Sequence, residues 1–160
     1  MSVLAYDVQR SEALVEEVGA VYVPLGRLFA DSDVVTLHAP LTDDTSQMVD
    51  ALLLARMPRH AVLINAARAG LVSQPDLYEA LRTGAVAGAG LDVLDPECPS
   101  AAGLRTLDNV VLTPHIGFNT AEASANLAAV CIDNVVRFLE GKPRNVAGPD
   151  GPAAPPAPPA

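Results

Sequence analysis

The stretch AVLINAARAGLVSQPDLYEALRTGAVAGAGLDV, residues 61–93, carries two short apolar runs, at 61–66 and 88–93. Neither run alternates with polar residues, which is typical of strands that are covered on both faces. Between them, residues 74–84 form a helical segment with a proline in its first turn and a glycine past its end, as helix boundaries favour. The stretch therefore predicts a strand, a crossover helix and a parallel strand.

The same alternation continues along the chain. Three further apolar runs of this kind occupy residues 3–7, 33–38 and 109–114, and residues 11–19 form another helix that starts at a serine cap and stops at a glycine. Alternating strands and helices predict an α/β fold with a doubly wound, Rossmann-like parallel sheet. Such sheets bind ligands beyond the carboxyl ends of their strands, so the residues that follow each run are the candidates for a site.

The last predicted helix has the clearest boundaries. Asn119 and Glu122 form a capping-box-like start, and Gly141 stops the helix. One helical face is apolar and consists of Leu127, Val130, Cys131, Val135 and Phe138. We therefore expect Cys131 to fill the core rather than to act as a reactive thiol.

Composition and charge exclude several function classes. The 160 residues are enough for one domain over residues 1–146, and a formal charge of -9 with scattered basic residues argues against nucleic acid as a partner. The chain shows no secretory leader and no apolar run of bilayer length, which predicts a cytoplasmic protein without a membrane partner. Cys98 and Cys131 stand too far apart to favour a disulfide or a metal site. Residues 147–160 are rich in Pro and Ala, which predicts a disordered tail.

Three side chains near the strand ends have complementary chemistry. Arg68, Glu97 and His115 lie on separate loops that we expect to meet at one edge of the sheet. An arginine binds a carboxylate through two parallel hydrogen bonds, and a histidine transfers a proton to or from a hydroxyl group. A carboxylate bound to the second ring nitrogen orients such a histidine. This combination predicts a substrate of the 2-oxo or 2-hydroxy acid type.

Each of these residues also has an ordinary structural explanation. Arg68 could be a charge that faces solvent, Glu97 a surface charge, and His115 a cap at the end of a strand. Asp92, which follows the run at 88–93, could simply cap a turn. Asp7 ends the first run, where this fold places the acid that binds the adenosine ribose and disfavours a 2′-phosphate, or it is an exposed residue that opens a loop.

Long segments of the chain also resemble a known family. DVVTLHAPLTDDT (33–45), residues 63–97 and DNVVLTPHIGFNTAEA (108–123) are similar to the nucleotide-binding domain of the D-isomer-specific 2-hydroxyacid dehydrogenases, which include D-3-phosphoglycerate dehydrogenase. The similarity runs in order from about residue 2 to residue 146. It implies an NAD-dependent oxidoreductase that interconverts a D-2-hydroxy acid and its 2-oxo acid, and a homodimer is the common assembly in the family.

The resemblance assigns a role to each site residue. It implies that Arg68 in NAAR binds the substrate carboxylate, that His115 in PHIG is the acid-base residue, and that Glu97 supports His115. It also implies a set of NAD contacts, namely Asp7 at the ribose, Ala39, Ala66 and Ala67 through their backbone beside Arg68, Asp92 at the nicotinamide amide, and the turn from His115 to Gly117.

The chain departs from the family pattern in four places. Ala69, Cys98 and the pair Phe118 and Asn119 replace residues that are more frequent in the family. Ala69 and Cys98 are compatible with the family's chemistry, and the pair is expected to influence the choice of substrate. The fourth departure is large, because the family carries a strand and a Gly-x-Gly-x-x-Gly turn ahead of the segment that ends at Asp7, and Met1 stands only six residues before Asp7.

The missing strand and turn have two expected consequences. Without the turn the chain lacks the site that holds the pyrophosphate, so NAD should bind weakly. Without the strand, which is central in this strand order, the strands at 3–7 and 33–38 should not pair unless they close up or another chain completes the sheet. Gly88 and Gly90 enter a strand rather than leave one, so they do not replace the turn.

Two functions follow from these observations. The first is an NAD-dependent dehydrogenase segment that is inactive or weakly active as an isolated chain, because the family's substrate domain is also absent. The second is a non-catalytic remnant, or one part of a longer or complemented protein that acts as a binding module. The DNA upstream of Met1, read in frame for a Gly-x-Gly-x-x-Gly motif, distinguishes a piece of a longer protein from a complete short one.

Overall fold

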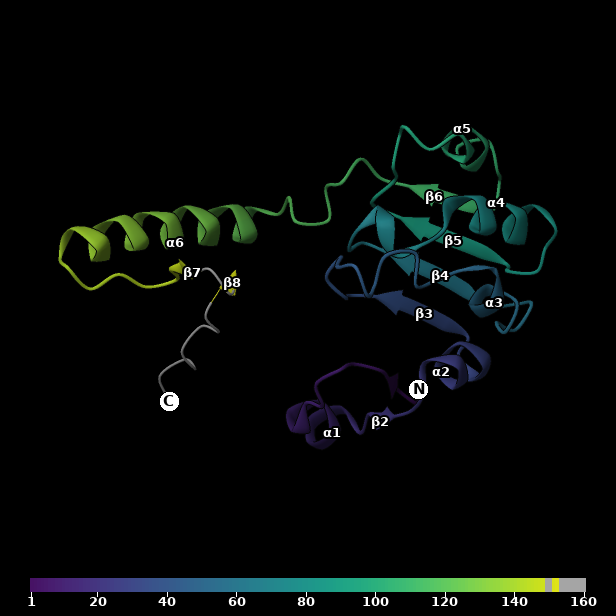
Figure 1. Cartoon of the computed structure of the whole chain (residues 1–160), viewed down its shortest axis with the longest axis horizontal. Helices are drawn as coiled ribbons and strands as arrows, with labels where there is room; N and C mark the ends of the chain where they lie inside the picture. Colours follow the sequence, from purple (N-terminus) through teal and green to yellow (C-terminus); the bar gives the residue numbers. More distant parts are fainter. Residues whose placement is uncertain (149–150, 153–160) are drawn as a thin grey trace. The chain divides into compact units, whose positions relative to one another are not determined.

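The fold is seen in a computed structural model that describes residues 1–148 and 151–152. Its main sheet is parallel, with the order β3-β4-β5-β6 (Figure 1). These strands are β3 (Val34–Leu37), β4 (Val62–Asn65), β5 (Gly88–Leu91) and β6 (Val110–Leu112). All four strands were predicted, so the α/β fold class with a parallel sheet is confirmed.

The register of this sheet aligns the carboxyl ends of its strands. Leu37 lies beside Asn65, and Asn65 lies beside Leu91. Leu91 in turn lies beside Leu112. The loops that follow the four strands therefore leave the sheet at the same edge, as the sequence predicted for the candidate site.

Two further strands form a sheet of their own. β1 (Leu4–Ala5) and β2 (Val21–Tyr22) pair in parallel, and neither pairs with β3 within the described residues. The predicted break between the strands at 3–7 and 33–38 is confirmed. The predicted helix between β1 and β2 is also confirmed as α1 (Glu12–Val18), where the Ser11 side chain accepts a hydrogen bond from Leu14 N–H and Gly19 adopts a φ of 68°.

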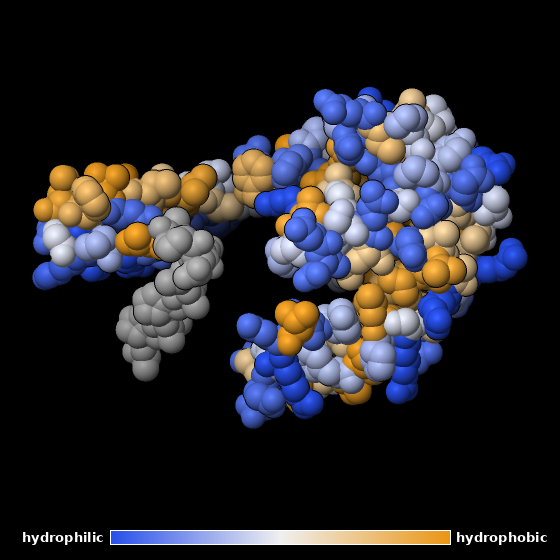
Figure 2. Space-filling model, viewed as in Figure 1, coloured by the Kyte–Doolittle hydropathy of each residue, from blue (hydrophilic) through white to orange (hydrophobic). Residues whose placement is uncertain are grey.

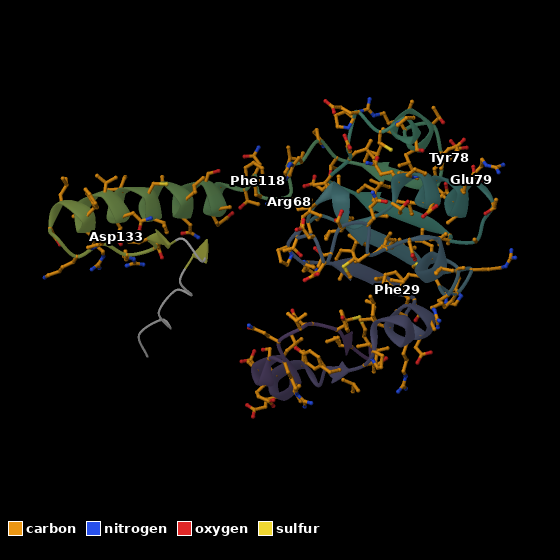
Figure 3. The ribbon with its side chains drawn as sticks, viewed as in Figure 1. Phe29, Arg68, Tyr78, Glu79, Phe118 and Asp133 are labelled. Atoms are coloured by element: carbon orange, nitrogen blue, oxygen red, sulfur yellow. The ribbon has the colours of Figure 1, made fainter. Side chains whose placement is uncertain are left out.

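Helices pack against the main sheet and form an apolar core with it. They are α2 (Leu25–Asp31), α3 (Ala51–Leu54), α4 (Gln74–Arg82), α5 (Ser100–Leu104) and the short 3-10 helix η1 (Ala69–Leu71). α4 contacts both α3 and α5. Leu77 of α4, Leu63 of β4 and Phe29 of α2 are fully buried in one apolar cluster, and Figure 3 labels Phe29. This burial fixes the sheet from which the candidate loops extend.

The chain divides into two compact units. The sheet unit comprises Met1–Gly117, and the helix unit comprises Phe118–Ala160. The domain that we predicted over residues 1–146 covers the sheet unit and most of the described helix unit, and its bounds stay a prediction. All residues of the candidate site belong to the sheet unit.

The helix unit contains α6 (Ala121–Leu139), which was predicted almost correctly. The cap is Thr120, whose Oγ1 accepts a hydrogen bond from Ala123 N–H at 3.1 Å, and not Asn119 as predicted. The prediction that Cys131 fills a core is wrong, because no residue of α6 is buried and Cys131 is exposed. Figure 2 shows hydrophobic side chains on the surface of this helix. Besides α6, the described residues of the unit supply only two very short strands, which is too little chain to cover an apolar face.

Those two strands fall in the segment predicted as a disordered tail. β7 (Ala147–Gly148) and β8 (Gly151–Pro152) pair antiparallel. The other residues of that segment, 149–150 and 153–160, lie outside the described residues.

In the part of the chain that the structure describes, no helix combines the length and the apolar character needed to cross a membrane. The cytoplasmic location stays a prediction.

Candidate active site

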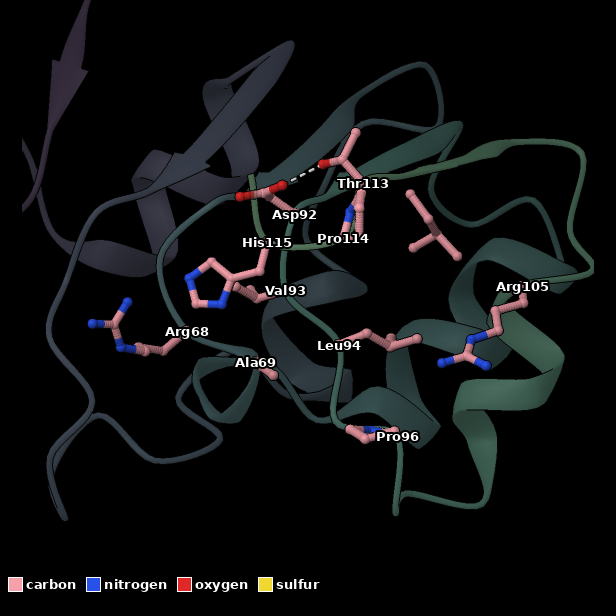
Figure 4. Close-up of a pocket in the computed structure, with 11 residues that line it drawn as sticks. Arg68, Ala69, Asp92, Val93, Leu94, Pro96, Arg105, Thr113, Pro114 and His115 are labelled. Carbon is pink, nitrogen blue, oxygen red and sulfur yellow. Dashed lines mark hydrogen bonds between the residues drawn. The ribbon is translucent and has the colours of Figure 1, made fainter. Parts of the chain in front are cut away.

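A cavity of about 550 Å³ opens at the carboxyl edge of the main sheet. Its walls come from the loops after β4, β5 and β6, from the end of β6 and from the residue that follows α5. The lining residues are Arg68, Ala69, Asp92, Val93, Leu94, Pro96, Arg105, Leu112, Thr113, Pro114 and His115. Figure 4 shows Arg68 and His115 at one end of this cavity and Arg105 at the other. The structure thus brings two of the three predicted catalytic residues, Arg68 and His115, to one site together with Asp92.

The Arg68 loop is held by a buried amide. Asn65, the last residue of β4, is only 1% exposed. Its Oδ1 accepts a hydrogen bond from Ala67 N–H at 3.1 Å, and its Nδ2 donates to the Arg68 carbonyl at 2.9 Å. Arg68 Nη1 also donates to the Ala67 carbonyl at 2.7 Å. The Asn65 side chain therefore fixes the backbone on both sides of Ala67, and the guanidinium is anchored to its own loop through one of its five N–H donors.

Asp92 connects the loops after β5 and β6. Its Oδ1 accepts hydrogen bonds from Thr113 Oγ1 and, at 3.0 Å, from Ile116 N–H, and its Oδ2 accepts from Gly117 N–H at 2.9 Å. These bonds lower the pKa of Asp92 below its ordinary value, the Thr113 hydroxyl having the largest effect, followed by the amides of Gly117 and Ile116. The charge of nearby His115 acts in the same direction. Asp92 is therefore an ionised acceptor at neutral pH.

His115 has an unusual backbone. Its φ is 56°, in the left-handed region that residues with a side chain seldom adopt. It lies within the loop whose amides bind Asp92, and its side chain lines the cavity. A strained residue in a cavity is a candidate for function, because the surrounding contacts have to maintain the strain.

Glu97 lies on an exposed loop beside the cavity wall. Its backbone N–H donates to Asp95 Oδ1 at 3.0 Å. Val93, Leu94 and Pro96 of the same loop line the cavity, but Glu97 does not. The structure therefore does not bring Glu97 into the cavity with Arg68. Its support of His115 stays a prediction.

The predicted cofactor contacts lie mostly outside the cavity wall. Asp7 is exposed just after β1, and its Oδ1 accepts a hydrogen bond from Gln9 N–H at 2.9 Å. Ala39 follows β3 and packs against the core, and Ala66 is exposed after β4. Ala67 already uses its N–H and its carbonyl within the loop. The roles of these residues toward NAD stay predictions.

Gly88 and Gly90 have a structural role in the sheet. Both lie within β5, where a Cβ on Gly90 would come within 2.9 Å of Ile64 Cδ1 and a Cβ on Gly88 within 3.0 Å of the Asn109 carbonyl oxygen. Neighbouring strands and loops therefore approach β5 closely at both positions. The prediction that Gly88 and Gly90 belong to a strand is confirmed.

Three residues of the site were not predicted as functional. Asn65 was predicted at the end of a strand, but no function was predicted for it. A buried amide at such a position indicates that the side chain anchors the following loop. Thr113 could have been found from the parallel register, because Leu91 beside Leu112 brings Asp92 next to Thr113. Arg105 had no comparable signal, since the sequence did not predict α5, which it follows directly.

Comparisons with known proteins show which family this chain is similar to. The family model described as "D-isomer specific 2-hydroxyacid dehydrogenase, NAD binding domain" matches residues 1–117. A glycerate dehydrogenase of Methylorubrum extorquens is 42% identical over 149 residues, which are 91% of this chain and 45% of that protein. A glyoxylate reductase of Korarchaeum cryptofilum is 41% identical over 94% of this chain and 46% of its own length. The chain thus spans just under half the length of these relatives.

A solved structure shows the same arrangement of elements. The D-lactate dehydrogenase from Aquifex aeolicus, complexed with NAD and lactic acid, superposes with a TM-score of 0.81 at 33% identity, and the match covers 89% of this chain and 47% of that one. The sequence, the parallel sheet and the residues of the cavity lead to the same family. The chain belongs to the D-isomer specific 2-hydroxyacid dehydrogenases, and its sheet unit is matched by their NAD-binding domain.

Proposed function

We propose that this chain is the cofactor-binding half of an NAD-dependent dehydrogenase that interconverts a D-2-hydroxy acid and its 2-oxo acid. The observation that carries the proposal is that Arg68 and His115, from two separate loops, line one cavity at the carboxyl edge of the sheet. The names of the relatives support the reaction class, because a glycerate dehydrogenase and a glyoxylate reductase are both among them.

Arg68 is proposed to bind the substrate carboxylate and to polarise the reacting carbonyl. One of its N–H groups is bound to the Ala67 carbonyl, so the four other donors of the guanidinium are not used by the described part of the chain. A planar guanidinium that stays charged matches a carboxylate through two parallel hydrogen bonds. The anchoring bond limits the rotation of the side chain and so lowers the entropy lost on binding.

His115 is proposed to transfer the proton. During reduction of a 2-oxo acid, the nicotinamide supplies a hydride to the carbonyl carbon when the cofactor is bound. His115 gives a proton to the carbonyl oxygen, which becomes the hydroxyl of the product. During oxidation His115 takes this proton back. Glu97 is proposed to orient the imidazole through its second ring nitrogen.

The described residues fit the nicotinamide end of NAD better than its pyrophosphate. The Asp92 carboxylate has about four acceptor positions, of which the three described hydrogen bonds leave one for the nicotinamide amide. Asp7 is proposed to bind the adenosine ribose and so to favour NAD over NADP, while Ala39, Ala66, Ala67 and the turn to Gly117 contact the cofactor through their backbone. The six residues given ahead of Asp7 include no glycine, so they supply no backbone turn for the pyrophosphate.

A calorimetric titration of the 160-residue chain tests the cofactor part of the proposal. We expect NADH to bind with a dissociation constant weaker than about 1 µM, which corresponds to roughly 8 kcal/mol. Tighter binding would show that the pyrophosphate does not need the glycine turn. An Asp7→Ala variant reports whether the ribose contact contributes to the binding that remains.

A chimera tests the reaction itself. In it, residues 1–146 replace the matching segment of the Methylorubrum extorquens glycerate dehydrogenase, which supplies the rest of a full-length relative. We expect the chimera to reduce small 2-oxo acids such as glyoxylate with NADH, and the loss of NADH absorbance measures the rate. His115→Ala should lower the rate by at least about 100-fold. Arg68→Ala should raise the substrate concentration at which the rate is half-maximal.

A matched control is His60→Ala, since His60 is exposed and pairs with Asp33 at 2.7 Å, away from the cavity wall. This variant should keep full activity. A folded chimera that binds NADH but reduces no 2-oxo acid would refute the proposed function, and activity that survives His115→Ala would refute the role of that residue.

A second candidate function is a binding module. It is favoured by the break between β1 and β3, because both strands keep an edge that no described strand covers.

A homodimer is a further proposal, supported by the family resemblance. Sedimentation velocity of the purified chain tests the dimer, and a monomer at all concentrations would contradict it.

A further inference from the structure

Asp92 makes contacts that a simple turn cap does not make. A turn cap binds backbone groups two or three residues away, as Asp95 does with Glu97 N–H at 3.0 Å. Asp92 instead binds three groups of the loop after β6, namely the hydroxyl of Thr113 and the amides of Ile116 and Gly117. These partners are 21 to 25 residues further along the chain. One carboxylate therefore joins two loops of the sheet edge.

The bound groups surround His115. Thr113 lies two residues before it, and the amides of the next two residues point at the Asp92 carboxylate. His115 itself has the left-handed φ of 56°. Two successive amides of one loop can converge on a single anion, as in the nests that bind anions. The left-handed residue lies directly before the two amides that bind Asp92.

Gly117 shows how closely the loop approaches. A Cβ at this position would lie 3.0 Å from Asp92 Oδ2, closer than nearly all contacts of a real Cβ. The loop has to lie tightly against the carboxylate for the Gly117 amide to reach it. A side chain at this position would push the loop away and change the direction of the His115 side chain.

We propose that Asp92 is a positioning residue, whose carboxylate holds residues 113–117 in the one conformation that directs the His115 imidazole into the cavity. The proposal rests on the proposed function, in which His115 transfers the proton. It adds to the predicted contact of Asp92 with the nicotinamide amide, because one acceptor position of the carboxylate remains for that contact. In this arrangement Asp92 places the proton-transfer group and the cofactor amide relative to each other.

The test compares three changes in the purified 160-residue chain by nuclear magnetic resonance. Asp92→Asn keeps the shape but replaces one acceptor oxygen with a donor, so the loop amides lose part of their partner. Thr113→Val removes only the hydroxyl, whereas Thr113→Ser keeps it. Asp95→Asn is the matched control, because it removes the same charge from a neighbouring loop position that binds only Glu97 N–H.

The readouts are local to the loop. We expect hydrogen exchange at the amides of Ile116 and Gly117 to become about tenfold faster or more in Asp92→Asn, since hydrogen bonds to charged acceptors are among the stronger ones. The ring and backbone resonances of His115 should shift in the same variant. Thr113→Val should give a smaller change in the same direction, and Thr113→Ser and Asp95→Asn should resemble the unchanged chain.

Two results would overturn the proposal. One is exchange at Ile116 and Gly117 that is as slow in Asp92→Asn as in Asp95→Asn. The other is an unchanged set of His115 resonances in Asp92→Asn. If Asp92→Asn does not fold, the comparison of Thr113→Val with Thr113→Ser decides in its place. None of these measurements needs NADH or a substrate, so an inactive chimera would refute the proposed function while these readouts test the positioning role on its own.

Discussion

Asn65 illustrates how a single buried polar side chain can shape the site. It is almost fully buried and makes two hydrogen bonds to the loop that carries Arg68. A buried polar group that loses its partner keeps its full desolvation penalty. The backbone around Arg68 therefore depends on this amide more than on any property of Arg68 itself.

We expect Asn65→Ala to lower the free energy of unfolding by about 1–3 kcal/mol, because the Ala67 amide and the Arg68 carbonyl lose their partner. Chemical denaturation followed by circular dichroism measures the change. Asn119→Ala is the control, since Asn119 is exposed and should change stability by less than about 0.5 kcal/mol. Equal effects of the two changes would mean that the buried amide does not hold the loop.

The lowered pKa of Asp92 predicts how the order of residues 113–117 depends on pH. Its pKa in the folded chain is lowered, mainly by the Thr113 hydroxyl and then by the amides of Gly117 and Ile116. A depressed pKa contributes stability above the unfolded value, which is about 3.9 for aspartate, and the contribution is lost as the pH falls through the lower folded value. We therefore expect the loop to keep its order from neutral pH down to about pH 4 and to lose it in stronger acid.

An acid titration that follows the amide resonances of Ile116 and Gly117 measures this transition. In Asp92→Asn the transition should be missing, because the amide side chain does not titrate. A loop that loses its order while Asp92 is still ionised, near pH 6, would show that another group controls it.

At the level of elements, β5 depends on its two glycines in different ways. A Cβ on Gly90 would meet the tip of the flexible Ile64 side chain, whereas a Cβ on Gly88 would meet the backbone oxygen of Asn109. A side chain can change its rotamer, but a backbone carbonyl in the loop before β6 moves only with its strand.

We expect Gly88→Ala to destabilise the chain by about 1–3 kcal/mol and Gly90→Ala by less than about 1 kcal/mol, although the contact at Gly90 is the shorter one. Thermal unfolding of the two variants side by side measures the order. The reverse order would mean that the packing of Ile64 is more rigid than the backbone around Asn109.

The elements that could be predicted from the sequence are those with a strong periodic or apolar signal. The continuous apolar runs became the strands of the main sheet, since strands covered on both faces need no polar alternation. β2 and α3 were not predicted, because two and four residues are too few to show a period. At the site, the sequence could predict that Arg68 and His115 lie together at the strand ends, but the bond from Thr113 to Asp92 required the register between β5 and β6.

Cys131 shows the limit of such reasoning. The apolar face of α6 was identified correctly, and yet none of its residues is buried. Periodicity indicates that a helix has a face suited to a partner surface, but it does not say whether that surface lies within the same compact unit. The sequence alone therefore predicted burial where the structure has exposure.

For the whole molecule, the two compact units have unequal roles in stability. Among the residues that the structure describes, the buried apolar ones all lie between Ala20 and Leu104, within the sheet unit. The match to the family model also ends at Gly117. α6 adds no buried side chain to the described part of the chain. The free energy of folding must therefore come almost entirely from the sheet unit, since burial of apolar surface is its main favourable contribution.

We expect a chain that stops after Gly117 to fold and to melt within about 4 °C of the full chain, which for a domain of this size corresponds to roughly 1 kcal/mol. A chain that stops after Asp108 is the matched contrast. It lacks only a few residues more, but among them is β6, whose Val110 and Leu112 pack against the core beside β5. This shorter chain should lose its cooperative unfolding transition in calorimetry. If the chain ending at Gly117 also lost it, α6 would have to contribute to the fold through contacts other than burial of its own side chains.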